Sequence, residues 1–294
     1  MESYLTRAAA FLNGNARLID RRRFDLVTGR DGGAGALAAL AAYRNPDGGF
    51  GWGLEPDLRS PESQPAGALH AFEVLAEAGG GEFGVPLCDW LDSVTLGDGG
   101  LPFALPVTEP AGSSWVWTEA GTTASSAQIT CAVAAAAHLV ARHDPAVRDH
   151  PWLARASAYC RERIAALTAL GHALEYRFML LFLDAADGTW PGADGEARRL
   201  VGFLPASGTV PVEGGIEGES MRPLDFAPHP GPVRDLLPPA LVEADLARLA
   251  AAQGEDGGWS VDFAAGSPAA ALAWRGYATV AAVKTLASSL LRPA

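Results

Sequence analysis

The sequence has few sulfur-containing side chains and almost no lysine. Its 294 residues include three cysteines and three methionines, and Lys284 is the single lysine. The cysteines stand at unrelated spacings, at Cys88, Cys131 and Cys160, so they do not resemble a disulfide framework. We therefore expect buried, reduced thiols and a cytoplasmic location. The formal net charge of −12 argues against a nucleic-acid partner and against binding to an anionic membrane.

Long apolar runs are also absent. No stretch reaches the roughly 18 uninterrupted apolar residues that span a bilayer, so we expect no integral membrane segment. The first residues contain no apolar run followed by a small-residue cleavage site, and we expect no secretory signal. Because 49% of the residues are apolar and only 19% are charged, the chain can bury a sizeable core.

A repeated turn is the most informative feature that the sequence does contain. The tetrapeptide Asp-Gly-Gly-Phe occupies 47–50, Asp-Gly-Gly-Leu occupies 98–101 and Asp-Gly-Gly-Trp occupies 256–259. A looser copy, Asp-Gly-Thr-Trp, occupies 187–190. A turn that recurs between helical segments indicates a repeat architecture.

Apolar residues at helical spacing, together with capping and breaking residues, predict an all-α protein. Ser63 is placed to cap the helix that follows Pro61, and the basic run 21–23 is expected to be a solvated face. We find no β-hairpin signal. The stretches 101–121 and 201–238 are expected to be irregular, the second as a cover over the helices. Helices are expected over 3–12, 35–43, 63–78, 86–94, 122–140, 149–167, 171–186, 239–252 and 267–290.

Two motifs carry a resemblance to a known superfamily. The segment 253–259, Gln-Gly-Glu-Asp-Gly-Gly-Trp, resembles the QxxDGxW motif of squalene/hopene cyclases, and 47–51 resembles the GGF loops of protein prenyltransferase β subunits. The resemblance implies a single α/α toroid over 1–294, with about six inner and about six outer helices around an apolar cavity. Its units would begin near 35, 86, 150 and 239, and 201–238 would be the covering loop.

The chemistry of those families is only partly present. The sequence has no DxDD motif, which protonates alkenes in triterpene cyclases, and no DDxxD motif, which binds Mg²⁺ and a prenyl diphosphate. The loop that matches the prenyltransferase zinc site carries Asp57 but no nearby cysteine. We therefore predict no cofactor, with Mg²⁺ entering only if the substrate is a diphosphate. The sequence leaves the oligomeric state open.

Candidate site residues follow from the prenyltransferase resemblance, in which the loop after the turn reaches the mouth of the cavity. A carboxylic acid buried there would keep its proton, because desolvation raises its pKa, and aromatic side chains would stabilise a carbocation. The catalytic candidates are Glu55, Asp57 and Asp262. The substrate-binding candidates are Arg59, Gln64, His70, Trp115, Trp117, Glu119, Arg222, Trp274, Arg275 and Tyr277, and Glu219 and Asp225 lie in the same loops.

The sequence leaves alternatives open both for the candidate residues and for the function of the protein. Asp57 and Arg59 would alternatively form an ion pair that orders the loop. The resemblance implies an enzyme that acts on a hydrophobic, isoprenoid-like molecule by acid-initiated cyclisation or isomerisation. The missing motifs favour instead a non-catalytic protein that binds hydrophobic ligands or partners within the same fold. A carbohydrate-active enzyme with paired carboxylates in an aromatic cleft is the third reading.

Overall fold

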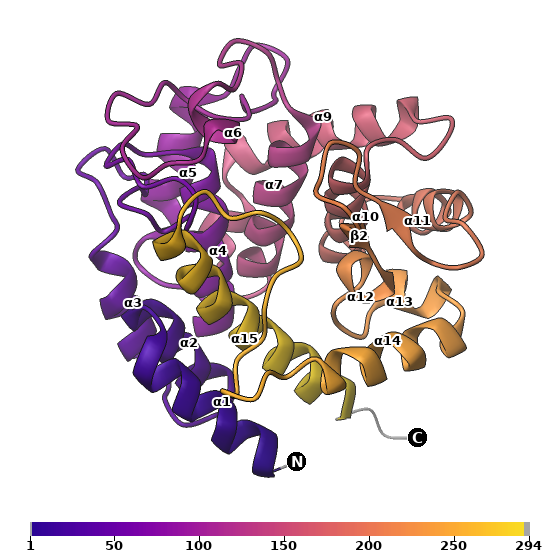
Figure 1. Ribbon diagram of the computed structural model, residues 1–294. Helices are drawn as coiled ribbons and strands as arrows, with labels where there is room; N and C mark the ends of the chain where they lie inside the picture. Colours follow the sequence, from indigo (N-terminus) through magenta and orange to yellow (C-terminus); the bar gives the residue numbers. More distant parts are fainter. Residues whose placement is uncertain (1, 291–294) are drawn as a thin grey trace.

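The computed structural model describes residues 2–290, and almost all of its regular structure is helical (Figure 1). The all-α class is confirmed, since the sheet found in 2–290 is one two-stranded antiparallel ladder. The elements are α1 (Glu2–Asn15), α2 (Leu18–Val27), α3 (Ala34–Ala41), α4 (Pro65–Ala78), α5 (Gly84–Val94), α6 (Trp115–Thr118), α7 (Ala127–Ala141), α8 (Pro145–Arg148), α9 (Pro151–Ala166), α10 (Ala173–Ala185), α11 (Ala193–Val201), β1 (Val210–Pro211), β2 (Ser220–Met221), α12 (Pro223–Phe226), α13 (Pro232–Leu236), α14 (Pro239–Ala251) and α15 (Pro268–Leu290).

Seven helices contact one another in a closed order. Helix α2 contacts α4, which contacts α7, and the series continues through α10, α12, α14 and α15 back to α2. Helices α1, α3, α5, α9 and α11 each pack against one or two members of this series. Figure 1 shows the chain curving round a central region, with α15 crossing beside the N-terminal helices. The first and last helices are therefore in contact, although they lie at opposite ends of the sequence.

The three Asp-Gly-Gly turns share one local structure. In each turn the Oδ1 atom of the aspartate accepts the backbone N–H of the glycine two residues further on, at 2.9 to 3.1 Å. The glycine between them has a positive φ of +88° to +93°, which strains any residue with a Cβ atom. The aspartates are Asp47, Asp98 and Asp256, and the positive-φ glycines are Gly48, Gly99 and Gly257.

Each turn is also bonded to the helix that follows it or to the residues just before that helix. The same aspartate oxygen accepts a side-chain hydrogen bond from Ser63, Ser125 or Arg275, at 2.6 to 2.8 Å. The residue after the second glycine is buried in all three copies, as Phe50, Leu101 and Trp259. Phe50 and Trp259 therefore pack between helices, which agrees with a structural purpose for these turn aromatics.

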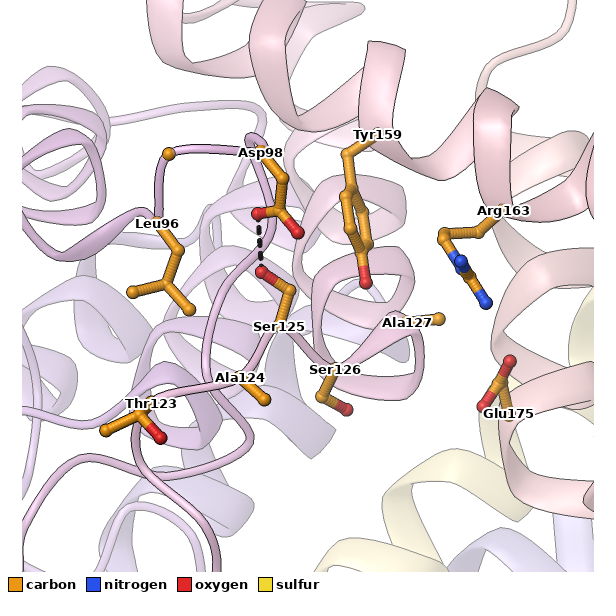
Figure 2. Close-up of a pocket in the computed structure, with 11 residues that line it drawn as sticks. Leu96, Asp98, Thr123, Ala124, Ser125, Ser126, Ala127, Tyr159, Arg163 and Glu175 are labelled. Carbon is orange, nitrogen blue, oxygen red and sulfur yellow. Dashed lines mark hydrogen bonds between the residues drawn. The ribbon is translucent and has the colours of Figure 1, made fainter.

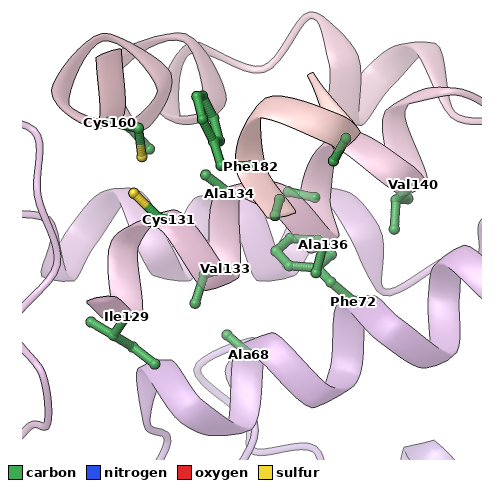
Figure 3. Packing of buried hydrophobic residues seen from close by; sticks show 14 of the residues in the cluster. Ala68, Phe72, Ile129, Cys131, Val133, Ala134, Ala136, Val140, Cys160 and Phe182 are labelled. Atoms are coloured by element: carbon green, nitrogen blue, oxygen red, sulfur yellow. The ribbon is translucent and has the colours of Figure 1, made fainter. Parts of the chain in front are cut away.

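Helix α7 forms the middle of the larger core. It packs against α4 on one side and against α9 and α10 on the other, and its alanines permit close approach. Figure 3 shows α7 between Phe72 of α4 and Phe182 of α10, both of which are fully buried. Cys131 and Cys160 point toward one another in this region (Figure 3). Both thiols are free and buried, as is Cys88.

Several local expectations were wrong. Ser63 does not cap α4, because the helix begins two residues later at Pro65, and Ser63 bonds to Asp47 instead. Residues 122–126 precede α7 rather than belonging to it. The segment 201–238 contains α12, α13 and a short hairpin in which Val210 pairs with Met221. Such a hairpin has too few residues to produce an alternating pattern in the sequence.

Within residues 2–290, none of the helices combines the length and apolar character that crossing a bilayer requires.

Candidate functional site

A group of charged and aromatic side chains lies where α2, α4 and α15 meet, and we call it the central polar cluster. It joins the loop after the first Asp-Gly-Gly turn to three helices that are distant in the sequence. Its members are Arg23, Glu55, His70, Glu73, Glu77, Tyr277 and Lys284.

The helical repeat explains how these side chains come together. His70, Glu73 and Glu77 are spaced three and four residues apart, so they share one face of α4. Tyr277 and Lys284 are seven residues apart and share one face of α15. The two faces meet directly, since Tyr277 bonds to Glu73 and Lys284 bonds to Glu77.

His70 is buried and is bonded through both ring nitrogens. Its Nε2 atom lies 2.7 Å from a carboxylate oxygen of Glu55, and its Nδ1 atom lies 3.0 Å from Glu73. Burial alone would lower the pKa of His70, but the two carboxylates, Glu73 foremost, raise it to about 9. At neutral pH the ring is therefore an imidazolium that donates to both carboxylates. Its edges contact the rings of Trp274 and Tyr277, at centroid separations of 6.0 and 5.2 Å.

Glu73 is the more accessible carboxylate on this face of α4. Its side chain is 23% exposed, whereas that of Glu77 is 2% exposed. Burial opposes ionisation of Glu73, but His70, Arg23 and the Tyr277 hydroxyl outweigh it and lower its pKa to about 2. Tyr277 donates to Glu73 at 2.8 Å. Burial, and then the charge of Glu73, raise the pKa of Tyr277 well above its ordinary value, so its hydroxyl keeps its proton.

Glu77 holds two cations in place. The guanidinium of Arg23 binds both of its oxygens, at 2.8 and 2.9 Å, and the ammonium of Lys284 binds one at 3.0 Å. These cations outweigh the cost of burial and lower the pKa of Glu77 to about 2. Arg23 also lies over the ring of Tyr277, 5.1 Å from its centroid. The expectation that Arg23 belongs to a solvated face was therefore wrong.

Asp57 lies beside the cluster and connects separate segments. One of its oxygens accepts the backbone N–H of Gly266 at 2.6 Å, and the other accepts the indole N–H of Trp274 at 2.7 Å. Its own backbone N–H donates to Glu55 at 3.1 Å. The ion pair between Asp57 and Arg59, which was the alternative interpretation, is not formed. Arg59 is held instead through its backbone N–H, which donates to Ser113.

The other candidates from the sequence lie outside the cluster. The side-chain amide of Gln64 donates to the backbone carbonyl of Leu105 and accepts the backbone N–H of the same residue. Trp117 stacks on Phe103 with a centroid separation of 4.7 Å. Trp115 is 70% exposed, and Glu119 is also exposed.

The candidates near the C-terminal end of the chain form local contacts. Asp262 and Arg222 form an ion pair at 2.8 Å, and Arg222 also donates its backbone N–H to Asp225. Glu219 accepts the backbone N–H of Ile216, and Arg275 bonds to Asp256 in the last turn.

The structure thus brings together Glu55, Asp57, His70, Trp274 and Tyr277 of the predicted residues. It adds Arg23, Glu73, Glu77 and Lys284, which sequence reasoning missed. The spacing of His70, Glu73 and Glu77 on an otherwise apolar helix was a usable signal, because three ionisable residues share the face that includes buried Ala66 and Val74. Nothing in the sequence indicated that Arg23 would reach them.

In the part of the chain that the structure describes, no group of three or more His, Cys, Asp or Glu side chains is arranged to hold a metal ion. The two imidazole nitrogens of His70 are both occupied by carboxylates.

Comparison with known proteins gives a likeness of fold. No protein-family model matches the chain, and a comparison with curated proteins finds no match. Among solved structures, the chain is similar to a protein from Actinoplanes, with a TM-score of 0.59 and 15% sequence identity. The similarity covers 98% of this chain and 99% of that one. At this identity it supports a shared fold over the whole length and says nothing of activity.

Proposed function

We propose that the chain is an α/α toroid and that its interior is an enzyme site for an isoprenoid-like molecule. The closed order of helix contacts supports the toroid. Helices α2, α4, α7, α10, α12 and α15 would form the inner ring, in which α12 is only a single short turn. The outer helices would be α1, α3, α5, α9, α11 and α14, and α14 would close the ring between α12 and α15, since it contacts both.

One observation carries the proposed activity, namely the hydrogen-bonded series Glu55, His70, Glu73 and Tyr277. It contains a proton donor on each side of an ionised, partly accessible carboxylate. The rings of Trp274 and Tyr277 stand against it and supply the aromatic surface that a hydrocarbon chain or a developing cation requires.

The pKa values favour isomerisation over acid-initiated cyclisation. A donor whose pKa is about 9, as for His70, is a weak acid at neutral pH and does not protonate an isolated alkene. Glu73, whose pKa is about 2, is ionised at neutral pH and partly exposed, so it is placed to accept a proton, although its low pKa makes it a weak base. We therefore propose that Glu73 removes a proton from the substrate, while His70 or Tyr277 returns one to a second position. In this scheme Asp57 and Glu55 are positioning residues, because they touch Trp274 and His70 respectively.

A second function is favoured by a specific feature of the cluster. Both oxygens of Glu73 and both oxygens of Glu77 are already bonded within the protein. A cluster satisfied in this way also serves to fix three helices, and the chain would then bind a hydrophobic ligand or partner without converting it.

Product analysis distinguishes these functions. The protein is incubated with C10 to C30 prenyl diphosphates and with squalene, with and without Mg²⁺, and the products are identified by mass spectrometry. Under the enzymatic proposal, Glu73→Gln loses about 100-fold or more in rate, as expected when a general base is removed. Glu82→Gln, an exposed substitution outside the cluster, keeps the rate.

Two results would contradict an enzymatic function in the ring. One is the absence of any product from every substrate, in a protein that nevertheless binds one of them. The other is a full rate in Glu73→Gln.

A further inference from the structure

A cavity lies away from the central polar cluster. It is open to solvent, has a volume of about 760 Å³, and is lined by the turn at Asp98, the segment before α7, and helices α9 and α10 (Figure 2). None of the residues that line it belongs to the central polar cluster. Its surface is largely polar and includes the side chains of Thr123, Ser125, Tyr159 and Glu175.

Tyr159 is the most informative residue of this cavity. Its side chain is only 7% exposed, and its hydroxyl makes no hydrogen bond with any residue in the described part of the chain. Figure 2 shows the hydroxyl directed into the cavity, between Ser126 and Arg163. Burial raises the pKa of Tyr159 to about 12, so the group is a neutral phenol that can both donate and accept.

Comparison of the three turns shows that the hydroxyl is not needed for packing. A Cβ atom on the second glycine of each turn would lie 2.7 to 2.8 Å from an aromatic ring of the outer helix. That ring is Trp90 at the first turn, Tyr159 at the second and Phe11 at the third. Only the ring beside the large cavity carries a hydroxyl, and this hydroxyl has no internal partner.

Two charged side chains face one another on the same side of the cavity. Arg163 comes from α9 and Glu175 from the first turn of α10, and Figure 2 shows their charged ends directed toward each other. Neither forms an ion pair within 4.0 Å with another described residue. Asp98 adds a second carboxylate, one oxygen of which is already bonded to Ser125.

This mixture of groups selects one ligand chemistry. Two carboxylates against one guanidinium disfavour an anion, and the accessible hydroxyls disfavour a hydrocarbon. A sugar hydroxyl donates and accepts at once, so it can bond to a phenol, a guanidinium and a carboxylate together. We propose that this cavity is a binding site for a short saccharide, held by Tyr159, Arg163 and Glu175. The site is separate from the one proposed in the ring, and neither depends on the other.

Ligand-observed saturation-transfer NMR on the full chain tests the site. Maltose, cellobiose and trehalose are the probes, and L-glutamate and an aromatic hydrocarbon are the comparison ligands. We expect transfer to at least one disaccharide, with a Kd of about 1 to 10 mM. Tyr159→Phe removes only the hydroxyl and should weaken that binding about 3- to 10-fold, which is the effect of one hydrogen bond. Arg163→Gln should weaken it as well.

The control is Glu162→Gln, which alters an exposed carboxylate of α9 outside the cavity lining and should leave binding unchanged. Thermal melting shows whether the hydroxyl is structural, since Tyr159→Phe should keep the melting temperature of the wild type. Four results would each overturn the proposal. The first is no transfer to any of the three disaccharides, and the second is binding of L-glutamate instead of a disaccharide. The third is disaccharide binding by Tyr159→Phe as strong as by the wild type, and the fourth is a lower melting temperature in Tyr159→Phe.

Discussion

Individual side chains in this protein are held by more than one segment of the chain. Asp57 accepts hydrogen bonds from Gly266 and from Trp274, and both donors lie more than 200 residues further along the sequence. His70 similarly joins a loop carboxylate to one on its own helix. A substitution at either position therefore alters contacts between segments, and its effect extends beyond the residue that is replaced.

Asp57→Asn tests this at the residue scale. An amide can accept a hydrogen bond through only one of its two terminal atoms, so either Gly266 or Trp274 loses its acceptor. We expect a loss of about 1 to 3 kcal/mol in the free energy of unfolding, measured by urea denaturation. Asp262→Asn, which alters a half-exposed carboxylate, is the matched control and should change stability by less than about 1 kcal/mol. Equal stability of the two variants would show that Asp57 does not fix these segments.

At the scale of helices and turns, α4 is the element to which the others are attached. It contacts α2, α3, α5 and α7, and its polar face binds side chains of α2 and α15. The turn before it is rigid because Asp47 is bonded both to Gly49 and to Ser63. Two predictions concern these attachments.

Glu77→Gln should be strongly destabilising. It removes the nearer counter-charge of the buried Arg23 guanidinium and leaves only Glu73, whose carboxylate oxygen lies 3.7 Å away, so a loss of about 3 kcal/mol is expected. Lys284→Met removes the other cation bound to Glu77, but that side chain is 35% exposed and Arg23 remains bonded, so about 1 kcal/mol is expected. Denaturant unfolding of both variants measures the difference. A loss for Glu77→Gln no larger than that for Lys284→Met would contradict this account of the buried pair.

Gly48→Val should prevent stable folding. The glycine has a φ of +93°, and a Cβ atom there would lie 2.7 Å from the backbone oxygen of Pro86. Strain and overlap together should cost about 3 kcal/mol or more. Gly14→Ala is the control, because a Cβ atom there meets nothing within 4 Å and alanine favours a helix, so stability should rise slightly. Circular dichroism melting compares them, and an unchanged melting temperature in Gly48→Val would refute the strained turn.

The elements were easier to predict from the sequence than the site. The turns and most helices were found, because a repeated Asp-Gly-Gly tetrapeptide and helical spacing are local signals. The short hairpin around Val210 and the helix α11 gave no comparable signal. Four of the seven residues of the central polar cluster were missed, two of them for a different reason. Arg23 and Lys284 become partners of buried Glu77 only when α2 and α15 come together, and that contact joins the two ends of the chain.

On the scale of the whole molecule, ionisable groups buried in different helices determine how stability depends on pH. His70 has a folded-state pKa of about 9, above the ordinary 6.5. Its contribution to the free energy of unfolding is therefore complete below pH 6.5 and is lost as the pH rises through 9. His138 and His229 have folded-state pKa values of about 4 and 3, so their contributions are present above pH 6.5 and are lost as the pH falls. Glu73 and Glu77, at about 2, lose theirs below pH 4.5.

We therefore expect the free energy of unfolding to be greatest near pH 6.5. Between pH 6.5 and 9 it should fall by about 3 kcal/mol through His70 alone. His70→Gln should remove this decline, whereas His229→Gln should alter only the acid side of the profile. Urea denaturation across this pH range measures both. If the free energy of unfolding still declines above pH 6.5 in His70→Gln, the decline arises from another group.

The protonation state of His70 tests the proposed site most directly, because the proposed proton transfers depend on an imidazolium held between two carboxylates. Its pKa can be measured by NMR titration of the ¹⁵N-labelled imidazole, with His70→Gln used to assign the signal. We predict a pKa of about 9 in the wild type and a lower value in Glu73→Gln, where one of the two carboxylates is neutral. A pKa at or below 6.5 in the wild type would contradict the account.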